Sequence, residues 1–313
     1  MGQKRGFWHE FKKNKALFLM LLPGFIVLLL NNYLPMFGVI IAFKNFKFVG
    51  DTFIESLLKS EWVGFKNFKF LFNTADAYAI TRNTLLYNLA FIVIGLVVAV
   101  GLAVALSEMR FPRLARIYQG AMFLPYFLSW VVASYLVYAF LGFDTGFINK
   151  TILARLGLPP VSWYNDPRPW PFILVFMHLW KWAGYNCVVY LAAILSIDPE
   201  YYEAAIIDGA SKWQQITNIT IPQLVPLMTV LTLLNIGRIF YADFGLFFHI
   251  PRNTGILYPV TNVIDTYVYN TLLYMGDIGM SSAAGLYQAV VGFTLVIITN
   301  TVIRKTNRDY ALF

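Results

Sequence analysis

Residues 198–222 read DPEYYEAAIIDGASKWQQITNITIP and lie between two long apolar runs. Asp198 is a favourable N-cap residue, and Pro199 suits a first helical turn because its missing N–H loses no hydrogen bond there. Gly209 is the expected end of this helix, since glycine readily adopts the left-handed conformation that closes many helices. Ser211 can cap a second helix directly afterwards. The stretch therefore predicts a compact helix–turn–helix between the two apolar runs.

The composition is typical of a membrane protein. The 313-residue chain is 58% hydrophobic and 13% charged, with a mean hydropathy of +0.61. Soluble domains carry roughly 25% charged residues, so the low charge indicates a lipid environment. The net charge of +8 is spread over the ends of apolar runs and forms no basic stripe with interleaved aromatics, which argues against a nucleic-acid partner. The single cysteine, Cys187, excludes an internal disulfide and is expected to be an inert hydrophobic residue.

Six apolar runs are long enough to span a membrane, since a helix of about 20 residues crosses roughly 30 Å of hydrocarbon. Each must be helical, because lipid offers no hydrogen-bond partner to free backbone groups. The runs are approximately 16–43, 85–106, 117–140, 171–196, 224–247 and 282–303. The first is too long for a signal peptide, and Asn31 and Pro35 suggest that its helix frays toward the outer surface. The predicted fold class is an all-α integral membrane protein with six transmembrane helices.

The distribution of positive charge indicates the orientation of these helices. With the N-terminus inside, the shorter inner segments carry twelve Lys and Arg residues and the longer outer segments carry ten. This bias places the N- and C-termini in the cytoplasm. The predicted regions are a basic N-terminus (1–15), a first helix with an outer extension (16–43), an extracytoplasmic loop (44–84), a core of five helices (85–303) that includes a cytoplasmic loop (197–223), and a cytoplasmic tail (304–313).

Two outer loops are rich in aromatic residues, which indicates packed or interface-lying caps rather than flexible linkers. They hold Trp62, Phe65, Phe68, Phe70 and Phe72 in one loop, and Trp163 and Tyr164 in the other. One interpretation is an aromatic belt at the lipid headgroups. The other is a docking surface for an external protein.

The loop 197–223 has a small-residue face. Ala204 and Ala205 put little bulk on its first helix, so another backbone can approach closely. A short, protruding helix of this kind suits docking into a groove on a partner protein. An ordinary surface helical hairpin is the alternative.

Several motifs in this chain resemble those of permease subunits from binding-protein-dependent ABC importers. The segment Glu203-Ala204-Ala205-x-x-x-Gly209-x9-Ile219-x-Ile221-Pro222 resembles their cytoplasmic coupling signature, with Ile221 in place of the usual leucine. Other segments are similar to the sugar-uptake branch of the family: Trp62–Phe68, Asn83-Thr84, Trp180-Lys181 and Asp208–Trp213. Arg238–Gly245 and Asp265–Tyr269 look like its oligosaccharide permeases, of the aldouronate or complex-polysaccharide type. The similarity covers nearly the whole chain.

This resemblance implies the type I ABC importer permease fold in a bacterial plasma membrane, and alternating access driven by a separate ATPase dimer. It also implies a second, homologous permease subunit (a heterodimer), an extracytoplasmic solute-binding protein and a carbohydrate substrate, expected to be an oligosaccharide. The residues that would fit the ATPase groove are Glu203, Ala204, Ala205, Asp208, Gly209, Ala210, Ile219 and Pro222. The chain contains no G-x-x-x-x-G-K-[ST] phosphate loop, so ATP and Mg are expected on the partner ATPase. No cofactor, metal site or enzymatic activity is expected in this chain.

Charged residues inside the predicted spans are candidates for the substrate pathway. Lys181 and Arg238 each cost at least about 2.5–3.5 kcal/mol to insert, so they should face a cavity or a partner. The candidate pathway residues are Lys181, Tyr185, Asn235, Arg238, Tyr241 and Asp243. Their polar groups would bind sugar hydroxyls, and their rings would stack on sugar faces. The alternatives are a structural ion pair of either cation with Asp243 or with the partner permease, or snorkelling toward the interface.

Three further features leave alternatives open. His178 is expected to be a hydrogen-bonded wall residue rather than a proton relay. The small residues Gly285, Ala289 and Gly292 permit close helix contact, either with the second permease or within the chain. An importer permease for a non-sugar solute is an alternative function. An ion-coupled secondary transporter is another, but it would need membrane carboxylates, and only Asp243 is a plausible one.

Overall fold

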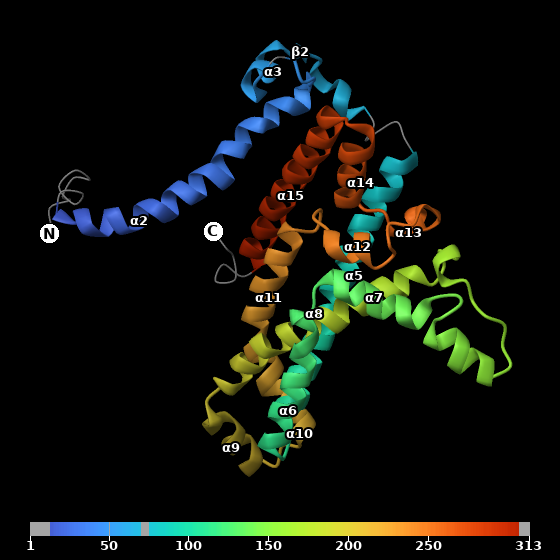
Figure 1. Ribbon diagram of the computed structural model, residues 1–313. Coiled ribbons are helices and arrows are strands. Elements are labelled where there is room, and N and C mark those ends of the chain that lie inside the picture. The colour runs from blue at the N-terminus through green and yellow to red at the C-terminus, as the bar shows by residue number, and fades with distance from the viewer. Residues whose placement is uncertain (1–12, 50, 70–74, 307–313) are drawn as a thin grey trace.

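The computed structural model describes residues 13–49, 51–69 and 75–306, and these residues are mostly helical (Figure 1). Most of the predicted basic N-terminus, the aromatic residues Phe70 and Phe72, and residues 307–313 of the predicted tail lie outside the described residues. Among the described residues, five helices are long and apolar enough to cross a membrane, or six if one bent pair counts as a single span. The expected helical membrane architecture is therefore confirmed, with five or six candidate spans and one small two-stranded sheet among the described residues.

The five long helices follow the expected order along the chain. They comprise α2 (Lys15–Leu28) continued by η1 (Leu29–Tyr33) and η2 (Leu34–Phe43), α5 (Ala75–Ser107), α8 (Trp170–Leu195), α10 (Lys212–Gln215) continued by η7 (Ile216–Thr220) and α11 (Ile221–Gly237), and α15 (Ile278–Thr306). The first helix does not fray at Asn31 but continues as π-helical and 3-10 turns. The helix α5 begins ten residues before the expected position 85, because its first turns are polar and hydropathy does not detect them.

The predicted third span, 117–140, is not one helix. The chain forms α6 (Pro112–Phe123) and η4 (Leu124–Phe127), then turns by 102° into α7 (Trp130–Leu141). The Ser129 side chain accepts a hydrogen bond from the backbone N–H of Val132 at 3.3 Å, so it caps a new helix after the bend. The run therefore does not form one continuous helix, which hydropathy could not reveal because it records apolar character and not the direction of the chain.

The predicted fifth span, 224–247, also ends early. The helix α11 stops at Gly237, and residues 238–243 are non-helical before the short helix α12 (Phe244–His249) begins. At its other end, the same helix begins earlier than expected, since it runs without a break from Lys212 through Pro222. A π-helical turn, η7, lies directly before this proline, where a backbone hydrogen bond is lost.

Side chains from three other elements satisfy the backbone of 238–243, which we call the unwound segment. Asn88 donates to the carbonyls of Ile239 (2.9 Å) and Tyr241 (3.3 Å), Gln288 donates to the carbonyl of Phe240 (2.8 Å), and the Asp265 carboxylate accepts from the N–H of Ala242 (2.8 Å). Asn88 lies on α5, Gln288 on α15 and Asp265 on α14 (Ile264–Asn270). These bonds explain how an irregular stretch persists where lipid surrounds the fold.

The remaining elements are short. A cap contains β1 (Lys44–Asn45) paired antiparallel with β2 (Glu61–Trp62), with α3 (Phe53–Lys59) and η3 (Gly64–Phe68) around them. We call it the outer cap because its residues belong to the predicted extracytoplasmic loop. The other elements are η5 (Ile148–Leu153), η6 (Trp163–Asn165), α9 (Pro199–Ile207), η8 (Gly255–Leu257), α13 (Tyr258–Thr261) and η9 (Thr271–Met275). In the cap, the rings of Phe43 and Trp62 stack at 5.7 Å and Phe65 meets Phe43 edge-on at 5.5 Å, so the aromatic residues there are packed, as predicted.

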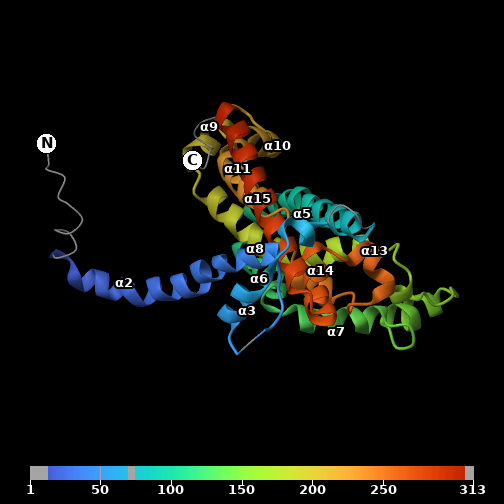
Figure 2. The ribbon, with the colours of Figure 1, turned by 90° about the horizontal axis from the view of Figure 1, so that it is seen from above.

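Buried clusters lie where α5, α8 and α11 pack together and where α5, α7, α8 and α12 meet. The helix α2 projects away from both clusters, whereas η2, which continues it, packs on α15 (Figure 1, Figure 2). None of the residues of α2 is buried, although nearly all are apolar. Within the core, Gly184 of α8 faces the backbone of Met122 on α6 so closely that a Cβ atom there would overlap the Met122 carbonyl. A Cβ atom added to Gly292 of α15 would lie 3.3 Å from the Gly237 carbonyl. Of the two alternatives for the small residues of α15, this close approach favours packing within the chain at Gly292.

Replacing Gly184 with alanine should destabilise the protein, because the added Cβ overlaps the α6 backbone. We expect a loss of about 1–3 kcal/mol and a lower midpoint of thermal unfolding in detergent. Gly101→Ala is the matched control, since Gly101 lies within the long helix α5 and a Cβ there meets nothing within 4 Å. Equal midpoints for the two variants would contradict the close contact between α6 and α8.

Candidate functional site

The loop 197–223 forms a rigid projection at the end of the molecule opposite the outer cap (Figure 1). Asp198 caps α9 by accepting from the N–H of Glu200 at 3.0 Å, with Pro199 in the first turn. Gly209 adopts φ = +78°, and the N–H of Ala210 donates to the Ala205 carbonyl at 2.8 Å. The predicted start and end of this helix are therefore confirmed.

A second helix follows, and several bonds fix it against the first. Ser211 and Gln214 form a capping box. The hydroxyls of Tyr202 and Thr220 lie 2.9 Å apart, and the Gln215 amide donates to the Ala210 carbonyl at 3.0 Å. The Lys212 ammonium lies 3.0 Å from the Glu108 carboxylate, at the end of α5. The loop thus contacts the end of α5 through this ion pair and continues directly into α11.

The predicted coupling residues lie mainly on the surface of this projection. Glu203, Ala204, Asp208, Gly209 and Pro222 are exposed, whereas Ala205, Ala210 and Ile219 are half-buried. The structure adds large apolar residues that sequence analysis missed: Tyr201, Ile206, Ile207 and Trp213, of which Ile207 is 85% exposed and Trp213 is 72% exposed. The sequence could have indicated these residues, because they are large and apolar and lie in a loop that is predicted to be helical. Such a surface is suited to a protein partner.

Two of the predicted pathway residues line a shared pocket of about 300 Å³ between α5, α8 and α11. Asn235 lies in the last turn of α11, and Arg238 directly follows this helix; both are exposed to the pocket. The helix ends between the two residues, since Arg238 is the C-cap residue of α11. Asn186 and Tyr190, which sequence analysis did not single out, also line the pocket from α8. Arg238 forms no ion pair with any residue that the structure describes.

Lys181 lies elsewhere, at the bend between η4 and α7. Its ammonium donates to the carbonyls of Tyr126 (3.1 Å) and Leu128, and it lies 5.1 Å from the centre of the Trp130 ring. The Trp130 indole N–H in turn donates to the Asp243 carboxylate at 2.9 Å. Lys181 is only 8% exposed. Among the described residues, Lys181 forms no ion pair with Asp243, which was one of the alternatives; its ammonium is bound by backbone carbonyls, and Trp130 lies between the two charged groups.

The other candidate residues divide between these two regions. The Tyr185 ring stacks on Tyr126 at 4.7 Å beside the bend. Tyr241 and Asp243 lie on the unwound segment, where Asp243 caps α12 by accepting from the N–H of Leu246. His178 stacks on Phe91 at 3.7 Å, and its buried Nδ1 has no hydrogen-bond partner in the part of the chain that the structure describes, unlike the expected bonded wall residue. The structure therefore brings Asn235 and Arg238 together and places Lys181 and Tyr185 at the bend.

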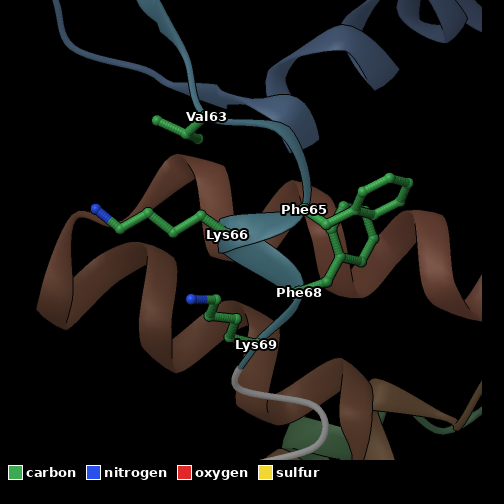
Figure 3. Close-up of a pocket in the computed structure, with 5 residues that line it drawn as sticks. All are labelled: Val63, Phe65, Lys66, Phe68 and Lys69. Atoms are coloured by element: carbon green, nitrogen blue, oxygen red, sulfur yellow. The ribbon is translucent and has the colours of Figure 1, made fainter.

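The outer cap has a separate hollow of about 680 Å³ beside η3 (Figure 3). Figure 3 shows Lys66 and Lys69 pointing to one side of the backbone and Phe65 and Phe68 to the other. The lysines and the rings do not converge on one point. This geometry does not form a shared binding site, so the hollow is not part of the candidate pathway.

The architecture and the projecting loop match a known family. A family model described as the binding-protein-dependent transport system inner membrane component matches residues 92–308. The chain belongs to this family. This importer permease is accordingly a transport component of the bacterial inner membrane and not an enzyme.

Similar proteins extend this match over nearly the whole permease. LplB of Bacillus subtilis (strain 168) is 33% identical over 299 residues, covering 95% of this chain and 91% of that protein. The polygalacturonan/rhamnogalacturonan transport system permease protein YteP of the same strain is 34% identical over 298 residues, covering 95% and 90%. A chain in the crystal structure of a bacterial ABC transporter involved in the import of the acidic polysaccharide alginate has a TM-score of 0.86 at 32% identity, covering 96% of this chain and 99% of that one. The expected ABC importer permease fold is thereby confirmed.

Replacing Lys181 with methionine should destabilise the permease. The variant keeps most of the side-chain volume but leaves the carbonyls of Tyr126 and Leu128 without their donor. Losing charged hydrogen bonds of this kind costs about 2 kcal/mol, which thermal unfolding in detergent would detect. Lys150→Met, at an exposed position in an outer loop, should have no effect. An unchanged unfolding midpoint for Lys181→Met would show that the bend does not depend on this cation.

Proposed function

We propose that this permease is the transmembrane subunit of an ATP-driven importer that moves a carbohydrate, and specifically an oligosaccharide, across the bacterial plasma membrane by alternating access. The loop 197–223 would receive the motion of a separate ATPase dimer. The observation that carries the proposal is the similarity, over 95% and 96% of the chain, to permeases of polygalacturonan/rhamnogalacturonan and alginate transporters. ATP and Mg would bind to the ATPase partner, and no cofactor would bind here.

The shape of the loop supports its role as the contact with the ATPase. It presents small residues, Ala204 and Gly209, beside the exposed apolar residues Ile207 and Trp213. Helix-in-groove docking uses apolar anchors on a short rigid helix. Because the second helix of the loop continues to Gly237 without a break, a displacement of the loop would also move the base of the Asn235 and Arg238 pocket.

The same arrangement supports a cytoplasmic location for both termini. If the loop faces the ATPase, it lies on the inner side of the membrane, as does the end of α5 that pairs with it through Lys212 and Glu108. Counting the bent α6–α7 pair as one span gives six crossings. An even number of crossings places both ends of the chain on one side, in agreement with the bias of positive charge.

The exposed helix α2 supports a second, homologous permease subunit as partner. Its apolar residues, such as Phe25 (59% exposed) and Met20 (78% exposed), are not covered by the rest of the chain. Membrane lipid would cover one side of this helix, and the second subunit would cover the other. An extracytoplasmic solute-binding protein would deliver the sugar, as an alginate pentasaccharide-bound periplasmic protein is seen in complex with the alginate transporter.

In the membrane, Asn235 and Arg238 would face the sugar pathway, with Asn186 and Tyr190 on the opposite wall. Amide and guanidinium groups donate to hydroxyl and carboxylate oxygens. The unwound segment would set the position of Tyr241, whereas Lys181, Tyr185 and Asp243 would shape the pathway through the bend rather than through direct contact. Alternating access requires segments that can adopt more than one conformation. The bend after η4 and the unwound segment would be these segments.

Gly209→Val should uncouple ATP hydrolysis from transport. A β-branched residue cannot easily adopt φ = +78°, so the turn between the two loop helices would change shape. We expect at least tenfold less ATP-driven uptake in proteoliposomes that hold the full complex, with normal membrane insertion. Gly157→Val is the control, because Gly157 has φ = +66° in an outer loop and is equally open. Equal losses in both variants would contradict a coupling role for the loop.

A panel of probes tests the substrate class. The full complex with its binding protein should import oligogalacturonate, arabino-oligosaccharide or maltotetraose in the presence of ATP, and should not import a tetrapeptide. Arg238→Ala should lower the uptake about tenfold, since a charged hydrogen bond is worth roughly 1.5–3 kcal/mol, whereas Arg155→Ala, in an exposed outer loop, should not. Import of the peptide alone would overturn the carbohydrate assignment. Equal uptake by the Arg238 and Arg155 variants would remove Arg238 from the pathway.

A further inference from the structure

A second polar pocket lies at the opposite end of α5 from the coupling loop. Its volume is about 580 Å³, and it is bounded by the first turns of α5, by α13, and by α14 with η9. Since α5 has 33 residues, its two ends are separated by about 50 Å. The pocket is therefore far from the loop 197–223 and, in the proposed orientation, opens to the outside. We call it the outer pocket.

Its lining combines aromatic rings with amides and one carboxylate. Tyr258, Tyr267 and Tyr274 contribute the rings, Asn262 and Asn270 the amides, and Asp76 the carboxylate. Small-molecule pockets typically combine apolar or aromatic walls with a few placed polar groups. Rings that stack on C–H faces, together with amide and carboxylate groups for hydroxyls, form the chemistry that recognises a sugar ring.

Hydrogen bonds from α5 hold one wall of the outer pocket in place. Asn83 donates to the carbonyls of Pro259 (3.2 Å) and Asn262 (2.9 Å), Thr84 accepts from the N–H of Ile264 (3.1 Å), and Tyr87 donates to the carbonyl of Val260 (2.7 Å). Thr84 is fully buried. These bonds join residues that are more than 170 positions apart in the sequence, and they hold the wall in place before any ligand binds. Less conformational entropy is therefore lost on binding.

The rings are also oriented by their neighbours. Arg252 and Asn253 both have positive φ, at +57° and +48°, an uncommon conformation for residues other than glycine. The Asn253 and Asn270 amides form a reciprocal pair at 3.2 and 3.3 Å, and the Tyr258 hydroxyl donates to Asn253 Oδ1 at 3.0 Å. Backbone strain of this kind tends to occur at functional sites.

Other polar groups in the outer pocket remain available. The Tyr274 hydroxyl and the Asp76 carboxylate form no hydrogen bond with the residues that the structure describes, and Tyr274 is 74% exposed. The Asn262 side chain accepts from Thr266 through its oxygen, at 2.6 Å, which leaves its amide N–H groups without a partner among the described residues. One side of the pocket is thus held in place, and the other presents an aromatic ring, a donor and an acceptor.

We propose that the outer pocket is a carbohydrate subsite that binds one ring of the incoming oligosaccharide before it enters the membrane, an inference that rests on the proposed function. The Tyr274 ring covers a face of the sugar, and Asp76 and Asn262 bind its hydroxyls. Because Asp76 is an exposed carboxylate, it repels acidic groups on the same ring. The outer pocket therefore binds the hydroxyls and the C–H face of a sugar ring and does not bind a carboxylate group on that ring.

Saturation-transfer NMR on the whole complex in lipid nanodiscs, without the binding protein or nucleotide, tests the subsite directly. Maltotetraose and oligogalacturonate serve as separate probes. We expect saturation transfer to maltotetraose with the wild-type complex, and about a fivefold smaller signal with Tyr274→Ala, as expected for the loss of one stacked ring. Tyr78→Ala is the matched control, because Tyr78 is 72% exposed in the same region of α5 but does not line the pocket. Asp76→Ala should also lower the saturation-transfer signal of maltotetraose. If the Tyr274→Ala permease does not assemble into the complex, the Asp76→Ala result decides the test.

A second measurement separates a sugar subsite from a docking surface for the binding protein. The concentration of loaded binding protein that gives half-maximal ATPase stimulation should be the same in wild type and Tyr274→Ala. A shift of this concentration, with no change in the NMR signal, would show that the pocket contacts protein and would overturn the proposal. Equal NMR signals for Tyr274→Ala, Asp76→Ala and Tyr78→Ala would overturn it as well. Failure of the proposed function would appear separately, as an absence of oligosaccharide uptake by the wild-type complex.

Discussion

Backbone polar groups find no water inside a bilayer, so every interruption of a transmembrane helix must be satisfied by the protein itself. This permease interrupts its helices twice, at the bend after η4 and at the unwound segment 238–243. A single ammonium, that of Lys181, supplies the donor at the bend. Asn88, Gln288 and Asp265 supply the partners at the unwound segment. The costly polar residues of the membrane region thus stabilise its irregular backbone, and the unwound segment places Arg238 at the polar pocket.

One continuous helix connects the two candidate functional regions. It runs for 26 residues from Lys212 to Gly237, a length of about 39 Å. Its first turn belongs to the projecting loop, and its last turn carries Asn235 at the pocket. A rigid helix of this kind transmits a displacement without a chain of small adjustments. The Lys212–Glu108 ion pair is exposed and adds little stability, but it joins the loop to the end of α5, the opposite wall of the same pocket.

The sequence predicts those features that depend on neighbouring residues, and misses those that depend on distant ones. Asp198, Gly209 and Ser211 determine local caps, so the ends of the loop helices could be predicted from their residue types. The runs of apolar residues predict most of the long helices for the same reason. The end of α11 at Gly237 depends on Asn88, about 150 positions away, and the bend before α7 depends on Lys181. Hydropathy contains no information on either contact. The sequence predicts a charge within a span at Lys181, but it cannot predict the neighbours of this charge from its position in the span.

The helix α14 places the outer pocket and the unwound segment on one short rigid element. Asp265 points to the N–H of Ala242, and Tyr267 and Asn270, less than two turns later, line the outer pocket. Burial raises the pKa of the Asp265 carboxyl, while its hydrogen bonds with Ala242 and Gln288 oppose this shift because they favour the charged form. A ring bound by Tyr274, Asp76 and Asn262 would restrain η9 and the helix α14 that it continues, and through Asp265 it would restrain the segment that carries Arg238. Sugar binding at the outer pocket would then be coupled to the conformation of the Asn235 and Arg238 pocket. The coupling free energy would be the same in both directions.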